Sequence, residues 1–134
     1  MGVRVLIVED DAVTRKVLHQ RLARIGCQVV AAVDNASAAL QSFRESKPDL
    51  VTLDIEMPEV DGIDSVALFR QIRREDVNCE ILVISGTAFP THREMFVREG
   101  ALAFFHKPVN FDRLAVELKM FFPDITHDKP SHAM

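Results

Sequence analysis

Short apolar runs alternate with segments of helical spacing along most of this chain. The runs, each of strand length, cover residues 3–8, 28–33, 50–53, 81–84 and 101–105. They are almost continuously apolar instead of alternating with polar residues, which is typical of parallel strands that are covered on both faces. The pattern therefore predicts five strands in one parallel sheet.

The segments between the runs place apolar residues three and four positions apart, as amphipathic helices do. The predicted stripes are Val13, Val17, Leu18, Leu22 and Ile25; Ala36, Ala39, Leu40 and Phe43; Ile63, Val66, Phe69 and Ile72; a weak one over 91–99; and Leu114, Ala115, Leu118, Phe121 and Phe122. Asp11 and Gly26 suit the start and end of the first helix, and Asn110 or Asp112 suits the start of the last. Strict alternation predicts an α/β fold, a doubly wound (βα)5 sheet with the flavodoxin-like strand order 2-1-3-4-5.

Length and composition indicate one domain with an ordinary core. A chain of 134 residues can bury about two-thirds of its unfolded surface without disulfides or metals. Cys27 and Cys79 lie in apolar stretches, where thiols behave as small hydrophobic groups in a reducing compartment. We expect a domain over residues 1–122. Residues 123–134 are polar and have no apolar stripe, which predicts a flexible C-terminal tail or the start of a linker.

The charge and the apolar runs argue against two classes of partner. A net charge of −4 offers no electrostatic footprint for a polyanion, so we expect no direct binding to nucleic acid. No apolar run approaches the roughly 18 residues of a membrane span, and the N-terminus leads into a strand instead of a signal peptide. We therefore expect no membrane association and a cytoplasmic location.

Groups that handle metal or phosphate follow four of the apolar runs. Glu9 and Asp10 follow the first, Asp54 the third, Ser85 the fourth and Lys107 the fifth. Ligands of doubly wound sheets bind beyond the carboxyl ends of the strands, where the winding reverses between strands one and three, so these side chains should converge. Two carboxylates about 4 Å apart repel by about 4 kcal/mol at an effective dielectric of about 20. A divalent cation, above all Mg²⁺, would relieve that repulsion.

Four motifs in order give the chain a specific resemblance. They are Val-Leu-Ile-Val-Glu-Asp-Asp at 5–11, Asp-Ile-Glu-Met-Pro-Glu-Val-Asp-Gly at 54–62, Ile-Leu-Val-Ile-Ser-Gly at 81–86 and Gly-Ala-Leu-Ala-Phe-Phe-His-Lys-Pro at 100–108. With them the chain resembles response regulator receiver domains, the CheY-like phospho-acceptor modules of two-component signalling. The resemblance extends over about residues 4–122 and implies a signalling switch. Such a switch would be no enzyme beyond Mg²⁺-dependent self-phosphorylation from small donors and self-dephosphorylation.

The resemblance also implies roles for the residues at the strand ends. Asp54 would accept the phosphoryl group, and Ser85 and Lys107 would bind it once transferred. Mg²⁺, with Mn²⁺ as an alternative, would be held by Glu9, Asp10, Asp54 and the backbone carbonyl of Glu56. The metal would let an anionic nucleophile approach an anionic phosphoryl group. The proline after Lys107 resembles one that the family precedes with a cis peptide.

Four positions would set the switch and its lifetime. The resemblance implies that Ser85 moves towards the phosphoryl group and that Phe104 then turns inward, changing the surface of the fourth helix, fifth strand and fifth helix. Glu56 and Thr87 would flank the path of the hydrolytic water and tune the lifetime of the signal. The family often has tyrosine at the position of Phe104 and threonine at that of Ser85.

The implied partners are proteins, and two other functions stay open. A histidine kinase or histidine phosphotransfer protein would donate the phosphoryl group, and a downstream protein target, a fused output domain or a homodimer formed on phosphorylation would receive the signal. One alternative is a constitutive scaffold that is never phosphorylated. The other is a phosphatase with an aspartate nucleophile, whose motif is similar to Asp-x-Asp-x-Thr, whereas Asp54 is followed by Ile-Glu-Met-Pro.

Overall fold

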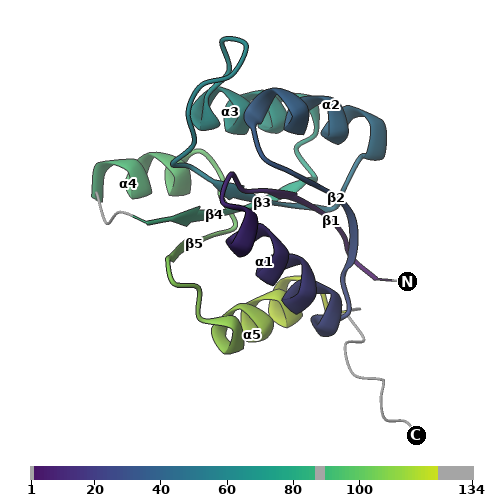
Figure 1. The fold of residues 1–134 in the computed structure, drawn as a ribbon. Coiled ribbons are helices and arrows are strands. Elements are labelled where there is room, and N and C mark those ends of the chain that lie inside the picture. Colours follow the sequence, from purple (N-terminus) through teal and green to yellow (C-terminus); the bar gives the residue numbers. More distant parts are fainter. Residues whose placement is uncertain (1, 87–89, 124–134) are drawn as a thin grey trace, which may run out of the picture.

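Five strands and five helices alternate along the chain in a computed structural model that describes residues 2–86 and 90–123. The elements are β1 Arg4–Val8, α1 Ala12–Ile25, β2 Gln28–Val33, α2 Ala36–Ser46, β3 Leu50–Asp54, α3 Ser65–Glu75, β4 Glu80–Ser85, α4 Pro90–Arg98, β5 Ala103–His106 and α5 Phe111–Phe121. All strand pairs are parallel, in the order β2-β1-β3-β4-β5 (Figure 1). The predicted flavodoxin-like α/β fold is confirmed.

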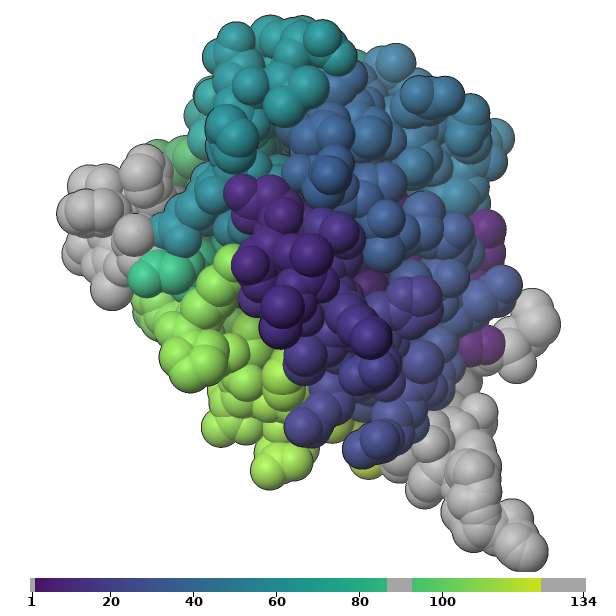
Figure 2. All heavy atoms as spheres, in the orientation of Figure 1, coloured from purple at the N-terminus to yellow at the C-terminus, as the bar shows by residue number. Residues whose placement is uncertain are grey.

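Helices cover both faces of the sheet and create two cores. On one face α2, α3 and α4 enclose a cluster that contains Phe69 and Phe96, with ring centroids 5.0 Å apart. On the other face α1 and α5 enclose a cluster that contains Leu22 and Leu118 (Figure 1). In the space-filling view, atoms of α1 lie between those of α2 and α3 above and α5 below (Figure 2).

Local chemistry explains where the helices begin and end. The side chains of Asp11, Asn35, Asp64 and Asn110 each accept a hydrogen bond from a backbone N–H in the first turn of the helix that follows. Such caps satisfy donors that have no partner within the helix. Gly26 ends α1 with a φ of 114°, a left-handed conformation that glycine adopts without strain. The predicted roles of Asp11 and Gly26 are confirmed, and Asn110 is the cap of α5.

The predicted boundaries need three corrections. Ile63 lies outside α3, because Asp64 caps that helix and Ile63 instead forms an isolated bridge with Val60. Val13 and Phe121, both predicted on buried stripes, are 71% and 49% exposed. Val13 is the second residue of α1 and Phe121 the last residue of α5. The edge strand β2 is only partly covered, unlike the interior strands β3 and β4.

Several other expectations can be compared with this fold. Cys27 and Cys79 are free and buried, and burial raises their pKa values to about 11 and about 12. Within residues 2–86 and 90–123, none of the helices is long and apolar enough to cross a bilayer. Thr87 and the predicted tail beyond Pro123 lie outside the described residues.

Candidate functional site

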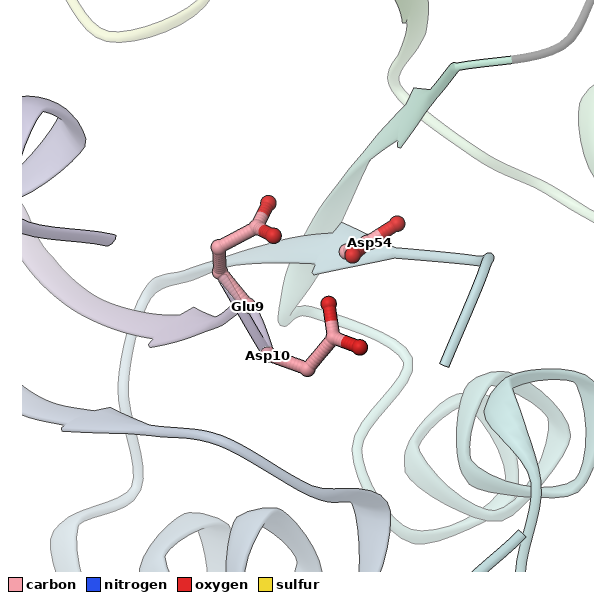
Figure 3. A group of neighbouring side chains, drawn as sticks. All are labelled: Glu9, Asp10 and Asp54. Atoms are coloured by element: carbon pink, nitrogen blue, oxygen red, sulfur yellow. The ribbon is translucent and has the colours of Figure 1, made fainter. Parts of the chain in front are cut away.

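Three carboxylates meet where β1 and β3 end. Val8 pairs with Leu53 in the parallel ladder, so Glu9 and Asp10, which follow β1, lie beside Asp54, the last residue of β3. One oxygen from each carboxylate lies within 4.8 Å of the others (Figure 3). Glu9 is 0% and Asp54 1% exposed, whereas Asp10 is at the surface. The convergence predicted from the strand ends is present.

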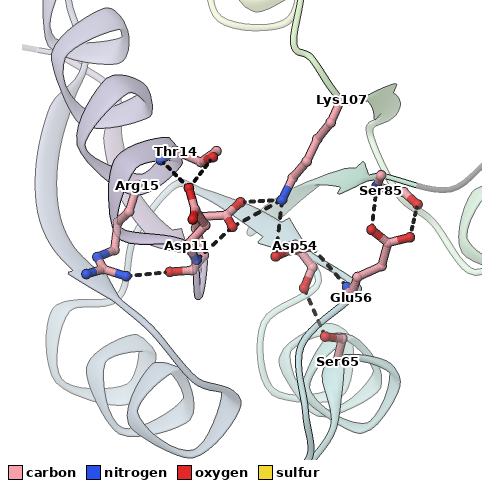
Figure 4. Close-up of polar contacts among 10 residues, drawn as sticks. Asp11, Thr14, Arg15, Asp54, Glu56, Ser65, Ser85 and Lys107 are labelled. Atoms are coloured by element: carbon pink, nitrogen blue, oxygen red, sulfur yellow. Dashed lines mark hydrogen bonds and ion pairs between the residues drawn. The ribbon is translucent and has the colours of Figure 1, made fainter.

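Lys107 brings a cation to this cluster from the end of β5. Its Nζ lies 3.0 Å from Oε1 of Glu9 and 3.4 Å from Oδ2 of Asp54 (Figure 4). Its backbone N–H donates to the carbonyl of Ser85 at 2.8 Å, which fixes the end of β5 beside the end of β4. The Lys107–Pro108 peptide is cis, as the resemblance implied. The lysine therefore bridges two of the three carboxylates.

The pKa values record the crowding of charge. Burial is the largest cause that raises the pKa of Asp54; the N–H of Glu56 opposes it and the charge of Glu9 adds to it. Burial and the nearby Asp54 raise the pKa of Asp10. Burial acts to lower the pKa of Lys107, yet its contacts with Glu9 and Asp54 outweigh that effect and raise it. Burial and mutual repulsion therefore destabilise the charged carboxylates, and Lys107 offsets this effect only in part.

The donor set fits a hard divalent cation. Three carboxylates supply the oxygen ligands that Mg²⁺ prefers. Oε1 of Glu9 is buried and forms no hydrogen bond within the part of the chain that the structure describes; its 3.0 Å contact with Lys107 is an ion pair without hydrogen-bond geometry. A buried carboxylate oxygen that forms an ion pair but no hydrogen bond can still bind a metal ion or accept a hydrogen bond from a metal-bound water.

Two residues that the sequence did not mark hold this cluster in place. The hydroxyl of Ser65 donates to the backbone carbonyl of Asp54 at 2.9 Å in a buried contact, and a guanidinium N–H of Arg15 donates to the carbonyl of Glu9 at 2.8 Å. No motif distinguishes them, because Ser65 reads as the residue after a helix cap and Arg15 as part of a polar helix face. Both orient the backbone that carries the carboxylates.

Glu56 turns back towards the end of β4. Its backbone N–H donates to Oδ1 of Asp54 at 2.9 Å, while its carboxylate accepts from the hydroxyl of Ser85 at 3.2 Å and from the N–H of Gly86 at 2.6 Å (Figure 4). Ser85 is 1% exposed and Glu56 is exposed. The hydroxyl predicted to reach the site is therefore present at its edge and engaged by a carboxylate.

Phe104 lies on β5, which β4 separates from β3, the strand of Asp54. It is 6% exposed and packs in the core beneath α4, and Phe105 is buried in the core on the opposite face. The rings of Phe104 and His106 are 5.3 Å apart, and the guanidinium of Arg93 on α4 lies 6.0 Å from the Phe104 ring. The ring predicted to turn inward is thus already buried in this conformation.

Comparisons with known proteins agree on one family. Residues 5–119 match the family model for the response regulator receiver domain. Chemotaxis protein CheY of Thermotoga maritima is 36% identical over 118 residues, 88% of this chain and 96% of that protein. CheY of Bacillus subtilis is 35% identical over 114 residues, 85% of this chain and 92% of that one. A chain in the CheX–CheY–BeF3–Mg²⁺ complex from Borrelia burgdorferi matches with a TM-score of 0.81 at 25% identity, covering 90% of this chain and 89% of that chain.

Proposed function

The chain belongs to the response regulator receiver domain family, and on that premise we propose that Asp54 accepts a phosphoryl group from the phosphohistidine of a histidine kinase or histidine phosphotransfer protein. A receiver domain of two-component signalling is a signalling module and not a catalytic enzyme, and the acidic pocket of Glu9, Asp10 and Asp54 fits a phospho-acceptor site. Two free buried cysteines suit the reducing cytoplasm in which we place this exchange.

One observation carries the proposal. The buried carboxylate of Asp54 lies within 4.8 Å of two further carboxylates and 3.4 Å from the ammonium of Lys107. A helix cap or a surface ion pair would require neither this burial nor this number of like charges. A nucleophile that receives an anion needs positive charge close by, and Lys107 supplies it from the end of β5.

The transfer is a substitution at phosphorus. A carboxylate oxygen of Asp54 forms a bond to phosphorus while the bond from phosphorus to the donor nitrogen breaks, and the electron pair of that bond returns to the histidine, which takes up a proton. The product is an acyl phosphate that places more negative charge beside Lys107. The N–H of Glu56, which donates to Oδ1 of Asp54 at 2.9 Å, and the Ser65 hydroxyl on the Asp54 carbonyl hold the nucleophile in one orientation.

We assign the metal position to the same carboxylates. Glu9, Asp10 and Asp54 would hold Mg²⁺ together with the backbone carbonyl of Glu56, and Mn²⁺ would serve in its place. When bound, the metal neutralises charge as the phosphoryl group is transferred. The Mg²⁺ named in the Borrelia burgdorferi CheY complex supports this assignment.

The output surface would be formed by α4, β5 and α5. Ser85 pairs with His106 across the β4–β5 ladder, and Val83 pairs with Phe104, so a movement of Ser85 acts directly on the strand that carries Phe104. Phe104 already lies in the core, so we propose that phosphorylation holds the ring there and limits its outward movement. The contact of Arg93 with that ring would pass the change to α4.

The partner that binds this surface would be another protein. The complex of CheY with CheX supports the binding of a separate protein. A downstream protein target, a fused output domain or a homodimer formed on phosphorylation would each use the same change in shape. We propose no direct contact with nucleic acid or membrane, in keeping with the net charge of −4.

Intact-mass spectrometry tests the acceptor. The natural chain and Asp54→Asn are incubated with acetyl phosphate, with Mg²⁺ and with EDTA. We expect one added phosphoryl group on the natural chain in Mg²⁺, and none on Asp54→Asn or in EDTA. An addition that survives in Asp54→Asn would reject Asp54 as the acceptor, and a lack of addition in all samples would favour the constitutive scaffold.

A further inference from the structure

The carboxylate of Glu56 occupies two hydrogen-bond donors at the end of β4. The Ser85 hydroxyl donates to Oε2 at 3.2 Å and the Gly86 N–H donates to Oε1 at 2.6 Å (Figure 4). One carboxylate thus joins the loop after β3 to the residues that close β4. Both of its oxygens are engaged by groups that lie close to the acceptor Asp54.

The same two donors lie at the end of β4, the strand that pairs with the strand of Asp54. Asp54 pairs with Ile84 in the parallel ladder, and the N–H of Ile55 donates to the Ile84 carbonyl at 3.1 Å, so Ser85 comes directly after the partner of Asp54. Neighbouring strands are about 4.8 Å apart. A phosphoryl group on Asp54 would present three strong acceptor oxygens. Lys107 can bind one, and the donors at the end of β4 are next to the others.

We propose that the Glu56 carboxylate is an internal competitor that holds the Ser85 hydroxyl and the Gly86 N–H until a phosphoryl group on Asp54 displaces it. This inference rests on the proposed function of Asp54 and adds a group that opposes binding of the phosphoryl group. In the resting state the Glu56 carboxylate takes the place that the phosphoryl group would occupy at these donors. The carboxylate has one negative charge and two oxygens, and a phosphoryl group would bring more of both. Phosphorylation then exchanges one anion for another at the same donors.

Gly86 provides the space that this arrangement needs. A Cβ at Gly86 would lie 2.6 Å from Oε1 of Glu56 and 3.9 Å from Cδ of Lys107. A side chain at this position would therefore crowd the carboxylate out of its present place. Gly86 thus lies close both to the Glu56 carboxylate and to the stem of Lys107, whose ammonium contacts Asp54. Resting anion and acceptor thus share one small region of the surface.

Electrostatics and exposure together set the size of the effect. The acyl phosphate carries about two negative charges where the Asp54 carboxylate carried one, in a region that already contains Glu9 and Asp10, so it repels Glu56 as well as competing for its donors. Glu56 is exposed, and its side chain can swing into water and regain hydration there. The competition should therefore weaken phosphoryl binding by a moderate factor and not abolish it.

A titration with beryllium fluoride, a non-hydrolysing stand-in for the phosphoryl group, measures the competition at equilibrium. The natural chain, Glu56→Ala, Glu56→Gln, Glu59→Gln and Asp54→Asn are titrated in Mg²⁺ and followed by the ¹⁵N–¹H signal of Gly86. We expect Glu56→Ala to reach half-saturation at a concentration about fivefold to tenfold lower than the natural chain. Glu56→Gln should fall between the two, because its carbonyl oxygen can keep one of the two hydrogen bonds. The exposed Glu59 controls for a general loss of charge in this loop, and Glu59→Gln should match the natural chain.

The resting protein offers an independent readout. Before any addition, the Gly86 N–H signal should lie downfield in the natural chain and in Glu59→Gln, and move upfield in Glu56→Ala as its acceptor is removed. Equal half-saturation in Glu56→Ala and the natural chain, with binding lost in Asp54→Asn, would overturn the competitor and leave the acceptor intact. If Glu56→Gln, Glu56→Ala and Glu59→Gln all lowered the half-saturating concentration of beryllium fluoride by the same factor, a general effect of charge would explain the data and the competitor would be rejected. Binding that persists in Asp54→Asn would reject the acceptor and the competitor together.

Discussion

Replacing Asp54 by asparagine should stabilise the metal-free protein. Asp54 is 1% exposed, and burial is the main cause that raises its pKa. Asparagine keeps nearly the same volume and the oxygen that accepts from the N–H of Glu56, and it removes the charge. The variant therefore isolates the cost of holding one more carboxylate in this cluster.

The magnitude follows from two distances and from the burial of Asp54. At an effective dielectric of about 20, the repulsion between Asp54 and Glu9 within 4.8 Å is about 3.5 kcal/mol. The exposed Asp10 adds a smaller, screened repulsion. The attraction to Lys107 at 3.4 Å is about 5 kcal/mol on the same scale, so these pairs come close to balance. The loss of hydration on burial then decides the sign, and we expect a gain of about 1–2 kcal/mol in the free energy of unfolding at pH 7.

The gain should depend on pH and on metal in defined directions. Because burial raises the pKa of Asp54 above its ordinary value of 3.8, the cost of its charge grows as pH rises above that value and is complete above the folded pKa. The advantage of asparagine therefore vanishes below about pH 4. Bound at the proposed position and present at one hundred times its dissociation constant, Mg²⁺ would stabilise the natural chain by about 2.7 kcal/mol. Saturating Mg²⁺ should therefore cancel or reverse the gain.

Urea unfolding followed by circular dichroism measures these differences in EDTA and in Mg²⁺. Asp34→Asn, at an exposed position after β2, serves as the matched control and should change little under either condition. A lower stability of Asp54→Asn in EDTA at pH 7 would refute the account of the charge cluster. The same gain with and without Mg²⁺ would refute the position of the metal.

Three further substitutions test the bonds around the site and the core. Lys107→Met should lower the free energy of unfolding by about 2–3 kcal/mol at pH 7, because two carboxylates lose their cation. Since the folded protein raises the pKa of Lys107, this difference in stability is complete below about pH 10 and is lost above the folded pKa. Urea unfolding at pH 7 and at high pH would show both. Asn35→Ala should cost about 1 kcal/mol by the same assay, because the Ala38 N–H loses its acceptor at 2.8 Å. Phe96→Ala should cost about 3–5 kcal/mol, since Phe96 is 0% exposed and its ring meets that of Phe69 edge to face; a cost below 1 kcal/mol in thermal unfolding would contradict this packing.

The sheet could be predicted because burial and strand length coincide in its interior. β3 and β4 are apolar almost throughout, and parallel strands between two helical layers have no solvent face that would mask the pattern. Helix ends depend on single polar contacts that periodicity does not contain. Ile63 fits the spacing of α3, yet the hydrogen bond from the Ala67 N–H to Asp64 starts that helix at Ser65.

Part of the candidate site could likewise be predicted from the sequence, and part could not. Glu9, Asp54 and Lys107 could be placed together from the sequence, because residues that follow parallel strands meet at one edge of the sheet. The contact between the Glu56 carboxylate and Gly86 joins two loops and depends on a side-chain conformation, which no spacing encodes. The buried hydrogen bond from Ser65 to the backbone carbonyl of Asp54 could not be predicted for the same reason.

The position of the acyl phosphate tests the central claim most directly. The protein is phosphorylated with acetyl phosphate in Mg²⁺ and treated with borohydride, which reduces an aspartyl phosphate to homoserine, and its peptides are sequenced by mass spectrometry. We predict homoserine at residue 54 and at no other aspartate. Homoserine at residue 10 or 11, or its absence from a chain whose mass shows an added phosphoryl group, would contradict Asp54 as the acceptor.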